Sequence, residues 1–297
     1  MRYQVKHVTR YGYGGPVSLC HSIAHLKPRE TRYQRCIAAN LRINPWPSVV
    51  REHRDYFGNR VNYFSVQQSH LQLEVTATAE VDVQPPAWPE PSATPPWDSV
   101  RRQLQRATTA DGLAARLFAL PSPAVAVDAI AVEYARESFK PGRPVLESAL
   151  ELIHRIHQDF DYDPSSTTVA TPLSEVLASR RGVCQDFAHL AISALRGLGL
   201  AARYVSGYLE TLPPPGQPKL RGADASHAWI ALYLPDAGES GDWIDLDPTN
   251  DCLLSDQYIT TAVGRDYKDV TPVRGVFYGG GEHSLEVSVD VDRVPSV

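Results

Sequence analysis

The hydrophobic pattern of this 297-residue chain changes at a proline-rich segment, and this change limits the folds that the chain can adopt. Before the segment, residues 71–83 alternate between apolar and polar side chains, which is typical of a β-strand with one polar face. After it, apolar side chains recur at helical spacing, most clearly over residues 146–160. The sequence therefore predicts a β-rich part followed by a part that contains helices.

The segment between the two patterns, residues 85–97, contains six prolines. Because proline fixes φ and lacks an N–H donor, this composition is typical of a semi-rigid extended linker. A proline-rich ligand for another domain is the alternative. We therefore predict a β-rich N-terminal domain over residues 1–85, a linker over 86–97 and an α+β domain over 98–297, whose core lies at about 145–255. In the last domain we expect a helix over 183–198 and strands over 202–209, 228–234, 242–246 and 285–291.

Composition excludes several classes of protein. A net charge of −5 argues against a nucleic-acid binder, because such proteins need a basic surface to replace counterions. The sequence contains neither a signal-peptide pattern nor a long apolar run typical of a membrane-spanning helix, so we expect a cytoplasmic protein without a membrane partner. The four cysteines form no CxxC or CxxH pair, so we expect no structural zinc site.

Cys184 has the most informative position of the four cysteines. It follows Arg181-Gly182-Val183 and opens an apolar-striped helix, so its backbone is expected at the positive end of the helix dipole. A thiolate is favoured there, which makes the cysteine more nucleophilic at neutral pH. The alternative is a buried, inert cysteine, which is a common fate of a free thiol.

A nucleophilic cysteine needs a base, and the base needs an acceptor that orients it. His227 begins a predicted strand, and Asp247 ends the next one before Pro248. If these strands pair antiparallel, His227 and Asp247 lie at the same end of the sheet. Asp245 is a competitor for Asp247, because side chains two residues apart on a strand share a face. The proline after Asp247 marks the end of the strand and favours Asp247.

Four blocks of sequence combine these residues in one order: Arg181–Leu190 (RGVCQDFAHL), Ala202–Tyr208 (ARYVSGY), His227–Trp229 (HAW) and Trp243–Thr249 (WIDLDPT). Together they resemble the core of bacterial transglutaminase-like proteins, whose members are often described as cysteine proteases. The first ~85 residues also resemble the β-rich N-terminal region that accompanies this core in bacteria. The resemblance implies a papain-related α+β core in which the nucleophile opens a central helix packed on an antiparallel sheet.

Carried over by position, the resemblance implies that Cys184 is the nucleophile, His227 the general base and acid, and Asp247 the group that orients His227. The backbone N–H of Cys184 is the expected oxyanion donor. No tryptophan lies between Trp97 and Trp229, so the upstream tryptophan that animal transglutaminases are expected to use does not carry over. Tyr162 or the side chain of Gln185 is the candidate for the second donor.

Three further residues are candidates for support of the site. Asp186 favours the helix dipole but places an anion near Cys184, and Arg203 on the following strand is its expected partner. Trp229 is a candidate to line the cleft, with core packing as the alternative. We expect no metal and no cofactor, because no EF-hand loop or cage of acidic residues is present in the sequence.

The sequence thus predicts a thiol-dependent hydrolase of amide or peptide bonds that acts through a thioester, with a peptide or protein amide as substrate. A protein-glutamine transamidase shares the same chemistry and is the first alternative. A non-catalytic peptide-binding or assembly module is the second. The proline-rich segment 212–220 is a candidate lid or specificity wall. The oligomeric state stays open.

Overall fold

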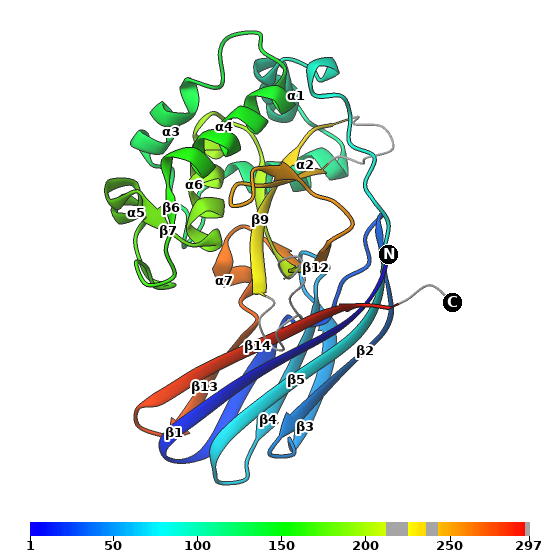
Figure 1. Cartoon of the computed structure of the whole chain (residues 1–297), viewed down its shortest axis with the longest axis vertical. Coiled ribbons are helices and arrows are strands. Elements are labelled where there is room, and N and C mark those ends of the chain that lie inside the picture. The colour runs from blue at the N-terminus through cyan, green and yellow to red at the C-terminus, as the bar shows by residue number, and fades with distance from the viewer. Residues whose placement is uncertain (212–224, 236–242, 295–297) are drawn as a thin grey trace, which may run out of the picture.

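The computed structural model describes residues 1–211, 225–235 and 243–294 of the chain. The chain folds into two parts that differ in secondary structure (Figure 1). One is a curled antiparallel sheet formed mainly by the first 83 residues, and the other is a smaller sheet covered by helices. The predicted loop 212–220 and Asp242, the first residue of a predicted strand, lie outside the described residues.

The curled sheet has seven strands, five of them in the order β2-β5-β1-β4-β3. Its alternating burial explains the period-two pattern of the sequence, since Leu73, Val75, Ala77 and Val81 on β5 point into the core. The strands are β1 (Arg2–Ala24), β2 (Gln34–Asn44), β3 (Val49–Arg54), β4 (Arg60–Val66), β5 (His70–Val83), β13 (Val273–Gly279) and β14 (His283–Arg293).

Strand β1 is the axis of this sheet and changes its neighbours halfway along. Its first half pairs with β5 on one side and β14 on the other, and its second half pairs with β4 and β13. The change occurs at Gly14-Gly15-Pro16, where the pairing register shifts. Figure 1 shows β14, the last strand, beside β1, the first.

The pairing of β13 and β14 corrects the predicted domain boundary. The prediction assigned all of 98–297 to the second domain, yet residues 273–293 complete the N-terminal sheet. The alternation at Leu285, Val287, Val289 and Val291 correctly predicted a strand. Periodicity identifies a strand but does not identify its neighbour, and this is why the assignment was wrong at the C-terminal end.

The second sheet is antiparallel, with the order β11-β10-β9-β8-β12. Its strands are β8 (Ala202–Leu209), β9 (Ala225–Tyr233), β10 (Trp243–Asp247), β11 (Cys252–Leu253) and β12 (Tyr258–Gly264), and a separate parallel pair joins β6 (Asp161–Tyr162) to β7 (Arg181–Gly182). The helices are α1 (Trp97–Gln105), α2 (Ala110–Arg116), α3 (Ala129–Arg136), α4 (Val145–Asp159), α5 (Leu173–Ser179), α6 (Cys184–Gly197) and α7 (Tyr267–Val270), with short 3-10 turns at Pro91–Ala93 and Leu117–Ala119.

Helix α6 is the central helix of the core, as the sequence predicted. Twelve of its fourteen residues are buried, and its apolar side chains pack with α3, α4 and one face of the second sheet. Gly199 follows the helix in the left-handed region, which suits the C′ position. Burying a helix on nearly all sides fixes its position, so its first residue is held firmly relative to the sheet.

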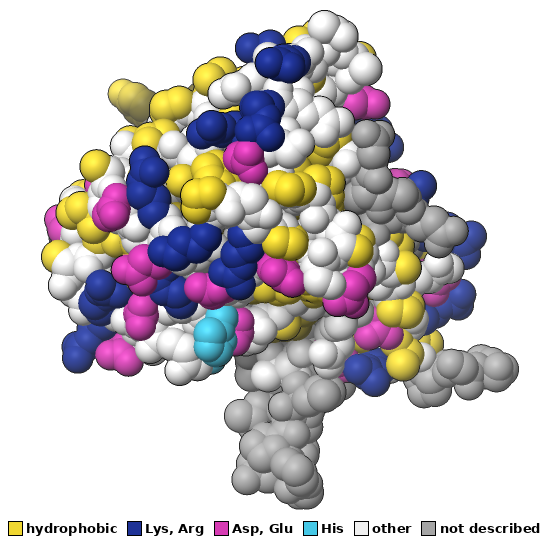
Figure 2. All heavy atoms as spheres, turned by 90° about the horizontal axis from the view of Figure 1, so that it is seen from above, with side chains coloured by type: hydrophobic (Ala, Val, Ile, Leu, Met, Phe, Trp, Pro, Cys, Tyr) yellow, Lys and Arg dark blue, Asp and Glu magenta, His cyan; other side chains and the backbone are white. Residues whose placement is uncertain are grey.

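The predicted linker packs against the core rather than standing away from it. Thr94 Oγ1 accepts a hydrogen bond from the backbone N–H of Leu146 at the start of α4, at 3.2 Å. Trp88 Nε1 donates to the carbonyl oxygen of Leu254 at 2.7 Å. On the helix-covered side of the molecule, Lys and Arg side chains are interspersed with Asp and Glu (Figure 2). None of the helices in the described ranges is long and apolar enough to cross a membrane.

Candidate active site

Cys184 is the first residue of α6, and the local sequence explains why the helix begins there. Gly182 lies in β7, and an added Cβ would meet the Asp186 side chain at 2.9 Å, so the chain needs glycine for this approach. Val183 is the extended residue before the helix, and its N–H donates to Asp186 Oδ2 at 2.9 Å. Cys184 itself is partly buried against the core. The thiol therefore lies at the positive end of a well-ordered helix.

His227 and Asp247 come together from two neighbouring strands. β9 and β10 pair antiparallel, with Leu246 opposite Ile230, so the start of β9 and the end of β10 lie at the same end of the sheet. His227 Nε2 is 2.7 Å from Asp247 Oδ2. Because Nε2 faces the carboxylate, Nδ1 is the nitrogen that remains for the thiol of Cys184.

Asp247 is fully buried and is surrounded by donors. Besides His227, its Oδ2 accepts from Tyr258 Oη at 2.8 Å and from Asn250 Nδ2 at 2.7 Å. Its Oδ1 accepts from the backbone N–H groups of Thr249 and Asn250 at 2.8 and 3.2 Å. Burial raises the pKa of Asp247, but the hydrogen bond and charge of His227 and the side-chain hydrogen bonds of Asn250 and Tyr258 outweigh burial and lower the pKa below its ordinary value. The carboxylate is thus held ionised beside His227.

The surroundings of His227 favour its protonated form. Burial lowers its pKa, but hydrogen bonds with Asp247 and Cys184 and the charges of both groups outweigh burial and raise the pKa to about 10. A charged imidazole next to a thiol stabilises the thiolate. The site therefore combines a thiol at a helix start with an imidazolium that Asp247 stabilises.

The two candidate oxyanion donors, Gln185 and Tyr162, lie near Cys184 on different elements and differ in exposure. Gln185 is buried as the second residue of α6. Tyr162 lies on β6, opposite Gly182 of β7, and its side chain is half exposed. Burial and the negative charge of Cys184 raise the pKa of Tyr162, so its hydroxyl stays protonated and can donate. The ring packs edge-on to Phe187, which is the packing alternative for this residue.

The expected pair between Asp186 and Arg203 is not formed among the described residues. Asp186 Oδ2 instead accepts from Val183 N–H and from Thr167 Oγ1, the latter at 2.6 Å. Arg203 neighbours Tyr204, which packs on the α6 side of β8, so Arg203 points to the opposite face and lies over the Trp243 ring at 4.3 Å. Strand alternation therefore separates the two charges.

Trp229 and Asp245 are held in the interior beside the site. Trp229 is fully buried, and its Nε1 donates to Asp245 Oδ1 at 3.1 Å. Its ring centroid is 6.2 Å from that of His227, so it packs against the imidazole. This position supports the packing role of Trp229, and it assigns Asp245 a partner other than His227.

Sequence reasoning missed Tyr258, Asn250 and Thr167. Asp247 Oδ1 accepts from the N–H of Thr249, two residues on, as in an Asx turn, and the turn brings Asn250 to the carboxylate, so this local signal could have identified Asn250. Tyr258 reaches Asp247 from β12, and no local pattern indicates that contact. Within the described ranges, we find no group of three or more His, Cys, Asp or Glu side chains that could hold a metal ion.

Comparisons with known proteins match the two parts of the chain separately. Residues 3–82 match the bacterial transglutaminase-like N-terminal region, and residues 132–248 match the transglutaminase-like superfamily. A crystal structure of "a Putative Cysteine Protease" from Cytophaga hutchinsonii has the same fold, with a TM-score of 0.74 and 22% sequence identity, covering 100% of this chain and 92% of that one.

Two mycobacterial relatives extend over nearly the whole chain. An uncharacterized protein of Mycobacterium tuberculosis is 44% identical over 297 residues, which cover 99% of this chain and 93% of the relative. An uncharacterized protein of Mycobacterium leprae is 33% identical over 300 residues, covering 99% of both chains. With the two regional matches and the shared fold, these relatives show that the chain belongs to the bacterial transglutaminase-like proteins of the transglutaminase-like superfamily.

Proposed function

We propose that this protein hydrolyses an amide bond of a peptide or protein, with Cys184 as nucleophile, His227 as general acid and base, and Asp247 as the group that orients His227. One observation carries the proposal. His227 lies 2.7 Å from a buried, ionised Asp247, and Cys184 at the start of a helix is close enough to help raise the pKa of His227. This arrangement has the parts that nucleophilic cysteine catalysis needs.

Membership of the transglutaminase-like superfamily supports a thiol-dependent hydrolase or transamidase in general terms. In both reactions, the Cys184 thiolate attacks the carbonyl carbon of the amide, and the C–N bond then breaks. His227 donates its proton to the leaving amine, which departs and leaves an acyl thioester on Cys184. The reactions differ only in the second nucleophile.

In hydrolysis, water attacks the thioester while neutral His227 accepts its proton, and the C–S bond breaks to release a carboxylic acid and the thiol. In transamidation, an amine attacks instead. Water is abundant, whereas nothing in the described site is built to hold an amine, and this favours hydrolysis. The negative charge on the carbonyl oxygen is expected at the backbone N–H of Cys184, with Tyr162 or Gln185 as the second donor.

Mass spectrometry after iodoacetamide treatment near pH 6 tests the activated thiol. We expect selective alkylation of Cys184, and its loss in His227→Ala. The other cysteines are internal controls, because burial raises the pKa of Cys20, Cys36 and Cys252. His157→Ala is the matched control, since that exposed histidine bonds only the Thr249 carbonyl. Equal alkylation of Cys184 in wild type and His227→Ala would contradict the proposal.

An amide substrate screen with and without added primary amine then separates the two reactions. Release of free carboxylic acid at a rate independent of the amine supports hydrolysis. Formation of a new amide that grows with amine concentration would identify a transamidase. Absence of turnover together with an unactivated Cys184 would favour the peptide-binding module.

A further inference from the structure

A cavity of about 290 Å³ lies on the face of the second sheet that points away from α6. Val205, Trp243 and Val263 line it, whereas their strand neighbours Tyr204, Ile244 and Ala262 pack on the α6 side. The other walls come from residues 29–34, which connect β1 to β2, and from Trp88 of the linker. Three separate parts of the chain therefore enclose this space, and Cys184 is not among its lining residues.

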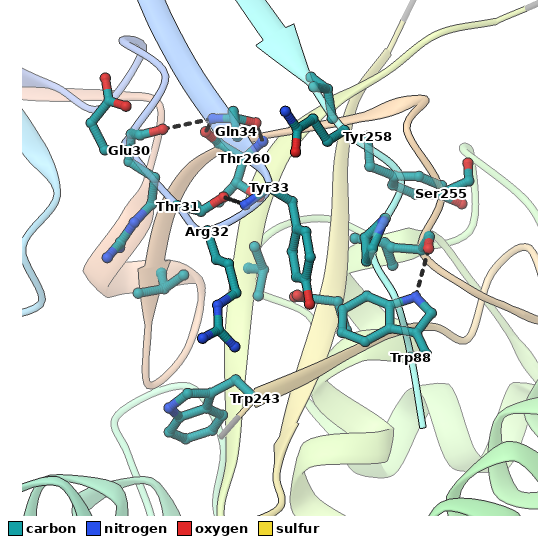
Figure 3. Close-up of a pocket in the computed structure, with 18 of the residues that line it drawn as sticks. Glu30, Thr31, Arg32, Tyr33, Gln34, Trp88, Trp243, Ser255, Tyr258 and Thr260 are labelled. Atoms are coloured by element: carbon teal, nitrogen blue, oxygen red, sulfur yellow. Dashed lines mark hydrogen bonds between the residues drawn. The ribbon is translucent and has the colours of Figure 1, made fainter. Parts of the chain in front are cut away.

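The cavity is rich in arginine. Arg29, Arg32 and Arg203 line it, whereas Asp245 and Glu30 are the only carboxylates among its lining residues. Figure 3 shows Glu30 directed away from the labelled aromatic residues, and its Oε1 accepts from the backbone N–H of Cys36. Arginines thus outnumber carboxylates among the lining residues, so the lining favours a negatively charged occupant.

Two of these arginines are stabilised only in part by their neighbours. The guanidinium of Arg29 donates to Asn59 Oδ1 at 2.6 Å and to the carbonyl oxygen of Phe57 at 3.3 Å, and the charges of Asp55 and Asp245 offset its burial only in part. Arg203 Nε is buried and has no hydrogen-bond partner among the described residues. Burial lowers the pKa of Arg203 to about 10, and the nearby charge of Asp245 offsets that loss only in part. A buried donor without an acceptor is costly, and an anion in the cavity would supply the acceptor.

Aromatic rings form part of the wall. In Figure 3, Arg32 extends toward Trp243, and Tyr33 stands beside Trp88, with ring centroids 5.8 Å apart. Indole and phenol rings offer flat apolar surfaces, and guanidinium groups stack on such rings. The cavity thus combines flat apolar rings with the guanidinium groups of arginines. Its volume suits a molecule of one ring and one acidic group.

We propose that this cavity binds a small organic anion in which a planar apolar body carries a carboxylate or phosphate. The arginines would hold the acidic group, and Trp88, Trp243 and Tyr33 would hold the planar body. This site goes beyond the proposed function, because it lies apart from the thiol. Tyr258 connects the two places, since it lines the cavity and donates to Asp247 at 2.8 Å.

Titration calorimetry on full-length Cys184→Ser protein tests the site independently of catalysis, with benzoate, phenyl phosphate, benzamide and acetate as probes. We expect saturable binding of benzoate or phenyl phosphate. Benzamide lacks the charge, so it should bind at least about tenfold more weakly. Acetate lacks the ring and should also bind more weakly. Benzoate and phenyl phosphate together distinguish a carboxylate from a phosphate ligand.

Variants locate the binding. Arg32→Gln changes an exposed side chain and should weaken benzoate binding at least about tenfold without loss of folding. Arg203→Lys keeps the charge but removes the planar fork, and should also weaken binding. Arg35→Gln is the matched control, because this exposed arginine pairs with Asp82 outside the cavity. Equal binding of benzoate and benzamide, no saturable binding, or unchanged binding in both Arg32→Gln and Arg203→Lys would overturn the proposal.

Discussion

At the residue scale, the carboxylate of Asp247 is the most constrained group of the site. It accepts five hydrogen bonds and is fully buried. A carboxylate held in this way cannot turn from His227, so it fixes both the orientation of the ring and the nitrogen that faces Cys184. Asp245, two residues earlier on the same strand, has no such contact with His227 and bonds Trp229 instead.

This difference makes Asp245 a control for Asp247. We expect Asp247→Asn to keep the fold but to lower turnover on the order of 10³–10⁴-fold, because an amide no longer fixes the tautomer and charge of His227. Alkylation of Cys184 near pH 6 should fall in parallel. Asp245→Asn should leave that alkylation close to wild type. If both variants alkylate alike, Asp247 does not orient His227.

The pKa of His227 predicts how stability depends on pH. Its pKa is raised from 6.5 to about 10 in the folded protein, so the folded state binds this proton more tightly than the unfolded state. The stabilisation is complete below pH 6.5 and is lost as the pH rises toward about 10. Urea unfolding at intervals from pH 6 to 10 should show this decline in wild type and a smaller decline in His227→Gln. Parallel curves would contradict it.

The residues of the site differ in how far the sequence could predict them. Cys184 begins a helix, Asp247 ends a strand and His227 is the third residue of another strand, and such positions near element ends leave a local signal. Tyr258 carries no such signal, because its contact with Asp247 depends on how β12 is placed in the sheet. The cavity also depends on long-range packing, since residues 29–34 and the second sheet are far apart in sequence.

At the scale of elements, a strong hydrophobic periodicity was sufficient to predict a helix or a strand, whereas a weak periodicity was not. The predicted strand 202–209 coincides with β8, and the predicted helix 183–198 with α6 to within one residue at each end. Strands β12 and β13 were missed. β13 contains Gly275 and has six exposed residues of seven, so it lacks the buried face that makes alternation visible.

Gly207 shows how tightly these elements are packed. A Cβ at this position of β8 would lie 2.1 Å from the Ile259 carbonyl oxygen and 2.5 Å from the Trp229 ring. Gly207→Ala must therefore separate β8 from β12 or displace Trp229, and should lower the free energy of unfolding by about 1–3 kcal/mol or more. Gly15→Ala is the control, because its Cβ would meet nothing nearer than 3.9 Å. Urea denaturation of both variants measures the difference, and equal stability would contradict the packing argument.

At the scale of the whole molecule, the two ends of the chain build one sheet. Glu210, which follows β8, accepts hydrogen bonds from Arg293 of β14 and from Tyr3 of β1. These bonds tie the N-terminal sheet to the second sheet. Tyr208 and Ile259 of the second sheet also share an apolar cluster with Tyr3, Val5 and Val291. The two regions that the sequence separates by composition are therefore one packed unit.

This arrangement predicts that the second region does not fold alone. A fragment of residues 98–297 contains the whole second sheet, but it leaves β13 and β14 without β1. We expect this fragment to aggregate or to lack a cooperative unfolding transition, because strands without neighbours expose unpaired backbone and apolar surface. The full-length chain should unfold in one transition. Circular dichroism during heating checks both, and a cooperatively folded fragment would contradict the prediction.

The position of β1 between β5 and β14 also sets an order of events during synthesis. Residues 3–13 leave the ribosome long before their partners at 283–293. At ~5–20 residues per second, roughly 15–60 s separate the two. Throughout that interval, the edge of β1 that β14 later covers stays open to other chains, so the newly made protein depends on rapid closure by β14.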